Sequence, residues 1–208
     1  YFENILKFTK PKLAITSNDL IMQFYSIKKI DKRIKLIVIQ NGGRFEKDLI
    51  KLRGFSVDYF FTFGKYHTKQ ISRFVKAKFV EIGSFRNNFY KNSFVKNKSL
   101  VFVSVLKESH GQMSPGEKKI LEFLNLFCDQ NNFKLCIFGR KPYNNKLKKI
   151  YLKYFKNINF EFLDNQKSYI SFYELYKKYN YFIFERSTAA YESTALGKKT
   201  LVFNYKNL

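Results

Sequence analysis

Residues 181–203, with the sequence YFIFERSTAAYESTALGKKTLVF, decide the fold of this chain. The apolar run at 181–184 predicts a buried strand, and the pattern at 187–196 predicts a helix that ends at Gly197. The apolar run at 199–203 then predicts a second strand. A strand, a helix and a strand joined by short connections form a parallel pair with a right-handed crossover.

The same alternation continues through the rest of the sequence. Strand-like runs lie at 13–16, 34–40, 59–63, 79–82, 100–105, 134–138 and 158–162, with helical patterns at 19–27, 66–75, 114–130, 146–155 and 168–178. Unbroken apolar runs such as 34–40 suit a parallel sheet that is covered on both faces. Periodicity fails at 85–99, which we interpret as a linker. We therefore predict an α/β protein with two Rossmann-like parallel-sheet lobes, at residues 1–90 and 91–208. Because the chain lacks an initial Met and stops within an alternation, we expect it to be truncated at both ends.

The formal net charge of +23 raises the question of a nucleic-acid partner, because basic side chains neutralise phosphates. The basic residues are spread along the whole chain and form no recognisable nucleic-acid module. Abundant Lys, Asn, Ile, Phe and Tyr point instead to the codon bias of an A+T-rich genome, so we expect no nucleic-acid partner. A basic surface would also favour peripheral contact with an anionic membrane.

The sequence indicates an intracellular setting. It has no apolar run of the roughly 20 residues that a membrane-spanning helix needs. The two cysteines, Cys128 and Cys136, have no pairing or metal-ligand spacing, which favours a reducing compartment. We expect a cytoplasmic protein, with a peripheral position at the inner membrane face as a further option.

The richest chemistry follows the strand at 181–184, where the carboxyl end of a parallel strand leads into a helix. Ligands of parallel α/β sheets bind at such ends. Ser187 and Thr188 lie where free amide groups favour an anion, and Glu192 follows one turn after Thr188. An anion at Thr188 with a hydroxyl-bearing ring at Glu192 would fit a nucleotide diphosphate, with Glu192 as an exposed carboxylate in an open cleft. A plain N-cap would equally explain Ser187 or Thr188, but a capping box does not require an acid at 192.

Residues 184–204 resemble the donor-site segment of GT-B glycosyltransferases, in particular of bacterial surface-carbohydrate biosynthesis proteins. The shared pattern is strand, Ser-Thr-x-x-x-Glu, helix, Gly-Lys-Lys and strand. The resemblance implies that Ser187 and Thr188 contact the donor phosphates and that Glu192 contacts the ribose. It also implies a donor lobe at 91–208 and an acceptor-side lobe at 1–90. Glu185 and Arg186 depart from the small or acidic pair that such segments often carry, which leaves the role of Arg186 open.

Other strand ends supply further candidates. Gly139 and Arg140 follow the strand at 134–138, where Gly139 permits close backbone approach and Arg140 could hold two phosphate oxygens, unless they form only a basic turn. In the first lobe, the residues that could contact an acceptor are Gln40, Asn41, Gly42, Gly43 and Ser84. A catalytic base needs a carboxylate or imidazole, and the available groups are Asp19, Glu46 and His110. No Asp-x-Asp motif occurs, so we expect no bound metal and no cofactor.

The leading hypothesis is a glycosyltransferase that moves a sugar from a nucleotide-sugar donor to a surface glycan or glycolipid acceptor. A nucleotide-sugar epimerase or a polyol-phosphate transferase would fit the same fold. A basic nucleic-acid-binding module is the alternative from another class, and a steep salt dependence of binding would reveal it.

Overall fold

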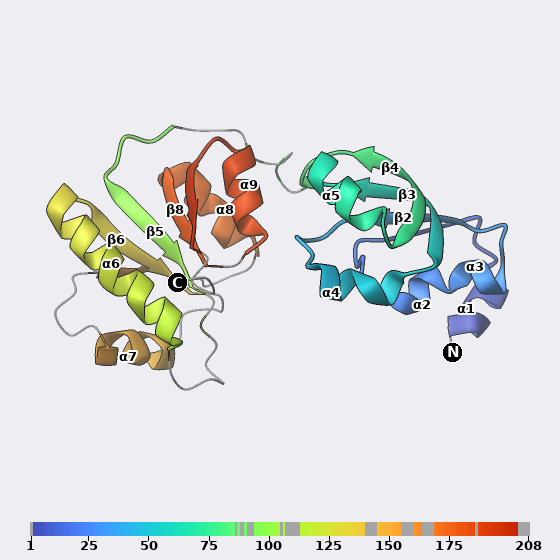
Figure 1. Cartoon of the computed structure of the whole chain (residues 1–208), viewed down its shortest axis with the longest axis horizontal. Coiled ribbons are helices and arrows are strands. Elements are labelled where there is room, and N and C mark those ends of the chain that lie inside the picture. The colour runs from blue at the N-terminus through green and yellow to red at the C-terminus, as the bar shows by residue number, and fades with distance from the viewer. Residues whose placement is uncertain are drawn as a thin grey trace. The chain divides into compact units, whose positions relative to one another are not determined.

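The computed structural model describes residues 2–85, 87, 90, 94–104, 106, 113–139, 145–154, 160–163, 169–185 and 187–203. The chain forms two compact units, Tyr1–Asn88 and Phe89–Leu208, each with its own parallel sheet (Figure 1). Two separate sheets confirm the predicted two-lobed α/β architecture. The boundary between the units, after Asn88, falls within the segment that the sequence marks as a linker and close to the predicted boundary after residue 90.

Unit 1 contains a four-stranded parallel sheet with the strands in chain order. Its elements are α1 (Phe2–Thr9), β1 (Leu13–Thr16), α2 (Met22–Tyr25), α3 (Ile27–Ile30), β2 (Lys35–Ile39), α4 (Glu46–Leu49), the 3₁₀ turn η1 (Ile50–Leu52), β3 (Phe55–Thr62), α5 (Lys65–Ile71) and β4 (Val75–Glu81). Right-handed crossovers that always step in the same direction place their helices on the same face of a sheet. The buried residues of α1 to α5 accordingly join a single core with Leu36, Val38 and Phe60 of the strands.

The opposite face of this sheet is open along β1, contrary to the expectation that both faces would be covered. Leu13 and Ile15 are 48% and 56% exposed, whereas Ala14 between them packs against the core. Because side chains alternate along a strand, one face of β1 contacts the helices and the other faces outward.

Unit 2 contains a five-stranded parallel sheet with the order β7-β6-β5-β8-β9. Its elements are β5 (Ser99–Val103), α6 (Pro115–Asn131), β6 (Lys134–Phe138), α7 (Asn145–Tyr154), β7 (Phe160–Leu163), α8 (Tyr169–Lys178), β8 (Tyr181–Phe184), α9 (Ala189–Ala195) and β9 (Lys199–Val202). The chain winds from β5 to β7 in one direction, then returns to the other side of β5 and winds to β9. This reversal puts α6 and α7 on one face and α8 and α9 on the other.

Two cores therefore sandwich the second sheet. Leu100 and Phe102 of β5 point to the core that contains Leu121 of α6 and Tyr151 of α7. Val101 and Val103 point to the opposite core, with residues of α8 and α9. Cys128 and Cys136 are buried as free thiols, one in each core, as expected for small hydrophobic residues.

The start of α6 follows the pattern read from the sequence. Ser114 is the N-cap, its hydroxyl accepts a hydrogen bond from the Glu117 amide at 3.1 Å, and Pro115 occupies the first turn. Asn132 ends the helix in the left-handed conformation, with φ of 55°.

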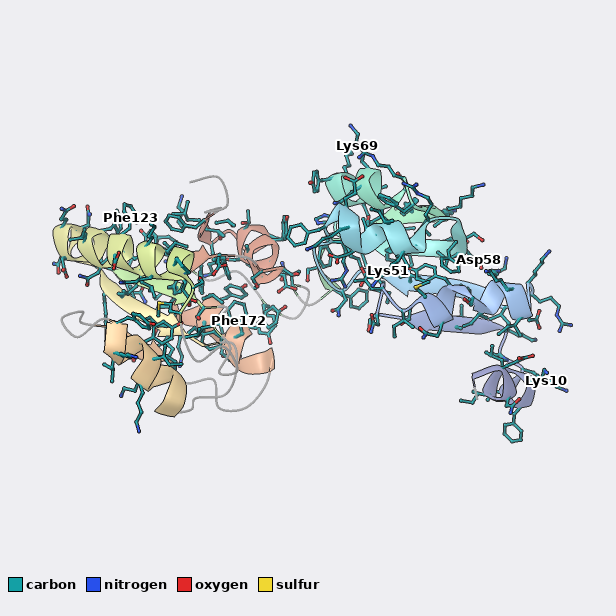
Figure 2. All side chains as sticks on the ribbon, turned by 60° about the horizontal axis from the view of Figure 1, so that its bottom comes forward. Lys10, Lys51, Asp58, Lys69, Phe123 and Phe172 are labelled. Atoms are coloured by element: carbon teal, nitrogen blue, oxygen red, sulfur yellow. The ribbon has the colours of Figure 1, made fainter. Side chains whose placement is uncertain are left out.

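The lysines are distributed over unit 1 rather than gathered on one element. Lys10, Lys51 and Lys69 project from three different segments, as Figure 2 shows. Within the described residues, no helix is long and apolar enough to cross a membrane.

Asp58 links the two inner strands of unit 1. It lies at a register shift in β3, where its carboxylate accepts a hydrogen bond from the Leu36 amide at 2.8 Å and pairs with Lys28 at 2.8 Å and Lys35 at 3.1 Å. Burial raises the pKa of Asp58, but the hydrogen bonds from Lys28, Leu36 and Lys35 outweigh it and lower the pKa from 3.8 to about 2.

Substitution of Asp58 by Asn should therefore lower the free energy of unfolding at pH 7 by about 1 kcal/mol, a value that allows for solvent screening. The carboxylate stabilises the fold above its unfolded-state pKa of 3.8, and this stabilisation is lost as the pH falls toward about 2. The difference between wild type and D58N should close over the same interval in urea titrations. The exposed Glu3 provides the control, since E3Q should change stability by less than about 0.5 kcal/mol. A D58N difference that persists below pH 2 would contradict the assignment.

Candidate functional site

The reversal of winding in unit 2 creates a topological switch point between β5 and β8. The two strands are parallel neighbours, with Val103 beside Phe184 at their carboxyl ends. From there the chain leaves toward α6 on one face and toward α9 on the other. Open α/β sheets bind ligands in the crevice outside such a point. The carboxyl ends of β5 and β8 are therefore the candidate site of this unit.

Ser187 and Thr188 lie at this edge, directly before α9. Both are half-buried, and the Ser187 hydroxyl accepts a hydrogen bond from the Ala189 amide at 3.2 Å. Thr188 is the N-cap residue, but its side chain makes no capping hydrogen bond. The helix is only seven residues long, so the local hydroxyls and amides matter more than a helix dipole.

Glu192 is buried rather than exposed, which corrects the sequence-based expectation. It is 3% exposed, and its Oε2 accepts a hydrogen bond from the Tyr173 hydroxyl of α8 at 2.5 Å. The Tyr173 ring in turn stacks on Tyr90, with ring centroids 4.7 Å apart. The expectation failed because helical spacing fixes the face on which Glu192 lies but does not reveal that α8 covers this face.

A second buried carboxylate, Glu117, lies on the α6 side of the same edge. Its Oε1 accepts hydrogen bonds from the Ser104 hydroxyl at 2.7 Å and from the Tyr151 hydroxyl at 2.8 Å. Ser104 follows β5 directly, and its Oγ also accepts a hydrogen bond from the Leu106 amide at 2.9 Å. The Ser104–Glu117–Tyr151 network thus joins the end of β5 to α6 and α7.

This network could not be recognised as part of the site from the sequence. The Ser114-x-x-Glu117 spacing signals a capping box, in which the Glu side chain returns to the cap. The amide half of that box forms, but the carboxylate turns inward to Ser104 and Tyr151. The signal in the sequence that could have indicated Glu117 is its position three residues into the helix that follows β5.

Electrostatics distinguish Glu117 from an ordinary surface carboxylate. Burial raises its pKa above 4.5, the hydrogen bonds from Ser104 and Tyr151 oppose that rise, and the charge of Glu185 adds to it. Glu185 comes directly after β8 and is itself buried. The switch point therefore has a buried carboxyl group on each side.

Gly139 is also at this edge, buried directly after β6. The other cationic or imidazole candidates of unit 2, Arg140, Arg186 and His110, lie outside the described residues. Among the residues that the structure describes, no group of three or more His, Cys, Asp or Glu could hold a metal ion. The predictions that no metal and no cofactor bind stay predictions.

In unit 1, the candidate residues after β2 take part in structural hydrogen bonds. The buried Gln40 side chain donates to the Gly42 carbonyl at 2.9 Å and accepts from the Phe63 amide at 2.9 Å. Asn41 is exposed, Gly42 is buried and Gly43 is half-buried. Gln40 therefore ties the β2–α4 loop to the end of β3, which leaves Asn41 as the accessible side chain of this group.

The catalytic candidates differ sharply in their surroundings. Asp19 is 1% exposed and forms a two-point ion pair with the Arg44 guanidinium, including a 2.9 Å bond from Nε. Glu46 is exposed in the first turn of α4. Ser84, an acceptor candidate, is half-buried, and its carbonyl accepts a hydrogen bond from the Asn87 amide at 3.0 Å. Asp19 thus stabilises the fold, because Arg44 already compensates its charge.

Comparison with solved structures defines the class: the fold is the Rossmann-like, GT-B-like α/β fold. The chain is similar to S. aureus MnaA in complex with UDP, with a TM-score of 0.64, 14% identity, and coverage of 96% of this chain and 60% of that one. It is also similar to the UDP-GlcNAc 2-epimerase of Neisseria meningitidis bound to UDP-GlcNAc, with a TM-score of 0.60, 16% identity, and coverage of 97% and 62%. The UDP-GlcNAc 2-epimerase of Methanocaldococcus jannaschii gives a TM-score of 0.58 at 11% identity, with coverage of 96% and 63%. The chain thus spans about 60% of the length of these structures.

The sequence comparison is more specific. A family described as "putative O-antigen biosynthesis protein" matches residues 105–207, just under half of the chain and all within unit 2. This match confirms the resemblance to bacterial surface-carbohydrate biosynthesis proteins. No curated protein matches the chain.

Two substitutions at Glu117 should separate the effect of its charge on the free energy of unfolding from the effect of its hydrogen bonds. E117A leaves the Ser104 and Tyr151 hydroxyls without their buried acceptor, so the free energy of unfolding should fall by about 2–4 kcal/mol. E117Q keeps an acceptor oxygen and removes the charge, so the loss at pH 7 should stay below about 1 kcal/mol. Denaturant titration of both variants measures these values.

The pH dependence provides the check. Because the folded-state pKa of Glu117 lies above 4.5, ionisation costs stability as the pH rises through that folded-state value. The free energy of unfolding of E117Q should therefore rise relative to that of wild type as the pH increases from about 4.5. A constant difference between E117Q and wild type would contradict a raised pKa.

Proposed function

We propose that the chain is part of a nucleotide-sugar-dependent glycosyltransferase of surface-carbohydrate biosynthesis, with the nucleotide diphosphate bound by unit 2 at the β5–β8 switch point. The observation that carries this proposal is the position of the Ser187–Thr188 segment at that switch point, between the end of β8 and the start of α9. The fold similarity to structures that hold UDP and UDP-GlcNAc supports a uridine nucleotide as the first donor to test.

The residues of this edge suit a departing nucleotide diphosphate. Transfer of the sugar leaves negative charge on the phosphates, and fixed donors stabilise that charge in a water-poor site. Ser187 and Thr188 would contribute hydroxyl and amide groups, while Arg140 and Arg186 would contribute guanidinium groups that match phosphate geometry. The buried Ser104–Glu117–Tyr151 network would hold the end of β5 against α6 and α7 without contacting the sugar.

Of the two described candidates for the catalytic base, the environments favour Glu46 over Asp19, and His110 lies outside the described residues. A base must be able to accept a proton from the acceptor hydroxyl. Asp19 is buried against Arg44, whereas Glu46 is accessible. We expect E46Q to reduce transfer more than D19N, with D19N acting mainly through stability.

A nucleotide-sugar epimerase is the second candidate, favoured by the epimerases among the structures of similar fold. The two activities differ in what they need. An epimerase converts the nucleotide sugar without any acceptor, whereas a transferase releases the nucleotide diphosphate only when an acceptor takes the sugar. Incubation with UDP-, GDP- and CDP-linked sugars, with and without a lipid-linked acceptor, followed by ³¹P and ¹H NMR, separates them. A new anomeric signal without acceptor would replace the transferase proposal by the epimerase.

Glu192 provides the sharpest test of the nucleotide site. If its carboxylate binds the ribose hydroxyls, E192Q should weaken binding of the nucleotide by about ten- to a hundredfold, since hydrogen bonds to a charged group contribute about 1.5–3 kcal/mol. Isothermal titration calorimetry with UDP and UDP-GlcNAc measures this change.

Y173F is the matched control because it removes the hydrogen bond to Glu192 and keeps the carboxylate. It should reduce the free energy of unfolding by about 1 kcal/mol while changing nucleotide affinity by less than about threefold. If E192Q loses stability but binds UDP as wild type does, Glu192 is a structural residue and the ribose assignment is wrong.

A further inference from the structure

An open pocket of about 720 Å³ lies at one edge of the sheet of unit 1. The end of α1 and the turn after it form one side, and the connection from α3 to β2 forms the other. Lys12 and Ile34 directly precede β1 and β2, so the pocket faces the amino ends of these strands. Substrates of parallel α/β sheets bind at the carboxyl ends. The pocket is therefore separate from the candidate acceptor residues that follow β2.

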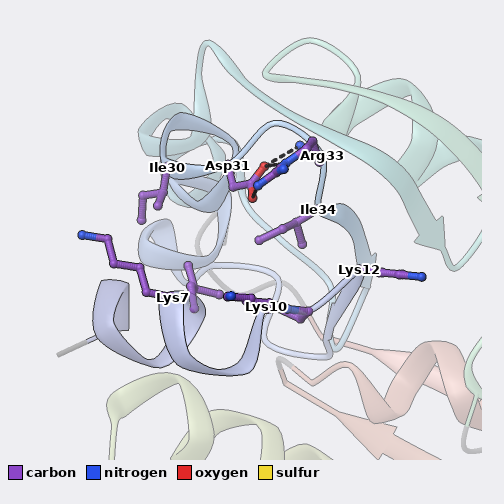
Figure 3. A pocket seen from close by; sticks show the side chains of 9 residues that line it. Lys7, Lys10, Lys12, Ile30, Asp31, Arg33 and Ile34 are labelled. Carbon is purple, nitrogen blue, oxygen red and sulfur yellow. Dashed lines mark hydrogen bonds and ion pairs between the residues drawn. The ribbon is translucent and has the colours of Figure 1, made fainter.

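Cations outnumber acids in the lining of this pocket. Its charged side chains are Lys7, Lys10, Lys12, Arg33 and Asp31 (Figure 3). Asp31 is already paired with the Arg33 guanidinium through two hydrogen bonds, of 3.0 and 2.8 Å. Lys7 is paired with Glu3 at 3.0 Å. Within the described ranges of the chain, the other two lysines form no ion pair, so their charge is available to an anion.

Lys10 has a backbone conformation that favours glycine. Its φ is 44°, and its amide donates to the Leu6 carbonyl at 2.9 Å, which makes Lys10 the left-handed residue that ends α1. This conformation is unfavourable for a residue with a Cβ atom. A lysine in the last turn of a helix stabilises the carbonyl end, which accounts for Lys7, but Lys10 lies beyond that turn. The unfavourable backbone of Lys10 points to a role for its side chain outside the helix.

Hydrogen bonds hold the backbone on both sides of the pocket. Pro11 fixes a backbone dihedral of the turn after α1, and the Lys12 carbonyl accepts a hydrogen bond from the Lys35 amide at 2.9 Å. On the opposite side, the Arg33 amide donates to the Asp31 carboxylate at 2.9 Å. A site whose backbone is already ordered loses less conformational entropy when a ligand binds.

The wall between the cations is apolar. Ile30 and Ile34 face α1 across the pocket, and the buried Leu6 of α1 completes this wall (Figure 3). Ile30 is 42% exposed, so an apolar group of a ligand gains by covering it. Apolar surroundings also strengthen an ion pair because they exclude water. The ligand that suits both features carries an anionic group for the lysines and a small apolar group for the isoleucines.

We propose that this pocket binds a soluble phosphate ester, at a site separate from the proposed nucleotide site of unit 2. Lys10 and Lys12 contact the phosphate, and the apolar part of the ester covers Ile30. Arg33 adds further donors, since a guanidinium has five N–H groups and the pair with Asp31 uses two of them. Inorganic phosphate fits less well, because it leaves the apolar wall exposed.

Phenyl phosphate is a suitable first probe, because it joins a phosphate to a small apolar ring. Titrated into the ¹⁵N-labelled chain, it should shift the backbone amide signals of Lys12, Ile30 and Arg33 along one saturable curve. Inorganic phosphate should shift the same signals with an affinity about five- to tenfold lower, because it buries no apolar surface. Benzyl alcohol, which has the ring without the charge, should leave these signals unchanged.

K10G separates binding from stability, because glycine suits the left-handed conformation and removes the cation. Its midpoint of urea denaturation should rise, whereas its affinity for phenyl phosphate should fall by about three- to fivefold, the contribution of one exposed charge. K10G/K12Q should lose about tenfold or more. K47Q/K51Q is the matched control, since it removes two exposed lysines from α4 and η1 of the same unit, and it should lose less than about twofold.

Three outcomes would overturn the proposal. Amide shifts that never saturate and occur at lysines of both units would show unspecific adsorption to a chain of net charge +23. Equal losses in K10G/K12Q and K47Q/K51Q would show the same. A response to random oligonucleotides or to phosphatidic acid vesicles, without any response to phenyl phosphate, would assign the pocket to nucleic acid or to a lipid headgroup. UDP binding, followed at the amide signals of Ser187 and Thr188, should be unchanged in K10G/K12Q, so failure here is distinct from failure of the proposed function.

Discussion

The direction in which successive right-handed crossovers step along each sheet determines where the helices lie and where a ligand crevice can form. In unit 1 the strand order follows the chain order, so every crossover steps the same way and the helices share one core. In unit 2 the direction reverses at β5, so helices cover both faces and two cores form. Only the second arrangement leaves a crevice between diverging connections, and this is why the best-supported site lies in unit 2.

The helices that cover both faces of this sheet bury polar side chains near the strand ends, and a buried polar group without a hydrogen-bond partner destabilises the fold. Internal hydrogen bonds supply such partners: Ser104 and Tyr151 donate to Glu117, and Tyr173 donates to Glu192. Buried polar groups that are fully hydrogen-bonded fix a unique arrangement, whereas partly bonded ones destabilise it. Tyrosine suits this role because its ring packs in the core while its hydroxyl reaches the carboxylate.

The alternation of strands and helices was sufficient to predict the two sheets, because unbroken apolar runs and a well-formed N-cap at Ser114 are local signals. The order of strands in each sheet is not local, so the switch point at β5 could not be placed from the sequence. For the same reason, the spacing of Thr188 and Glu192 identified a helix face but not Tyr173, the group that covers it. Asp19 could not be recognised as a structural residue from the sequence, because its partner Arg44 lies 25 residues away and only the fold brings the two together.

The charge of the chain acts differently at its exposed surface and at the partly buried switch point. A surface of net charge +23 attracts any polyanion at long range, and this attraction weakens as salt shortens the Debye length. Contacts at an exposed helix such as α1 belong to this screened class, because Lys10 and Lys12 are surrounded by water. Groups at the switch point are half-buried or buried, so salt screens their interactions less than it screens those of the exposed lysines. The selectivity of the proposed nucleotide site therefore depends on how Ser187, Thr188 and Glu192 are held, and less on the net charge of the chain.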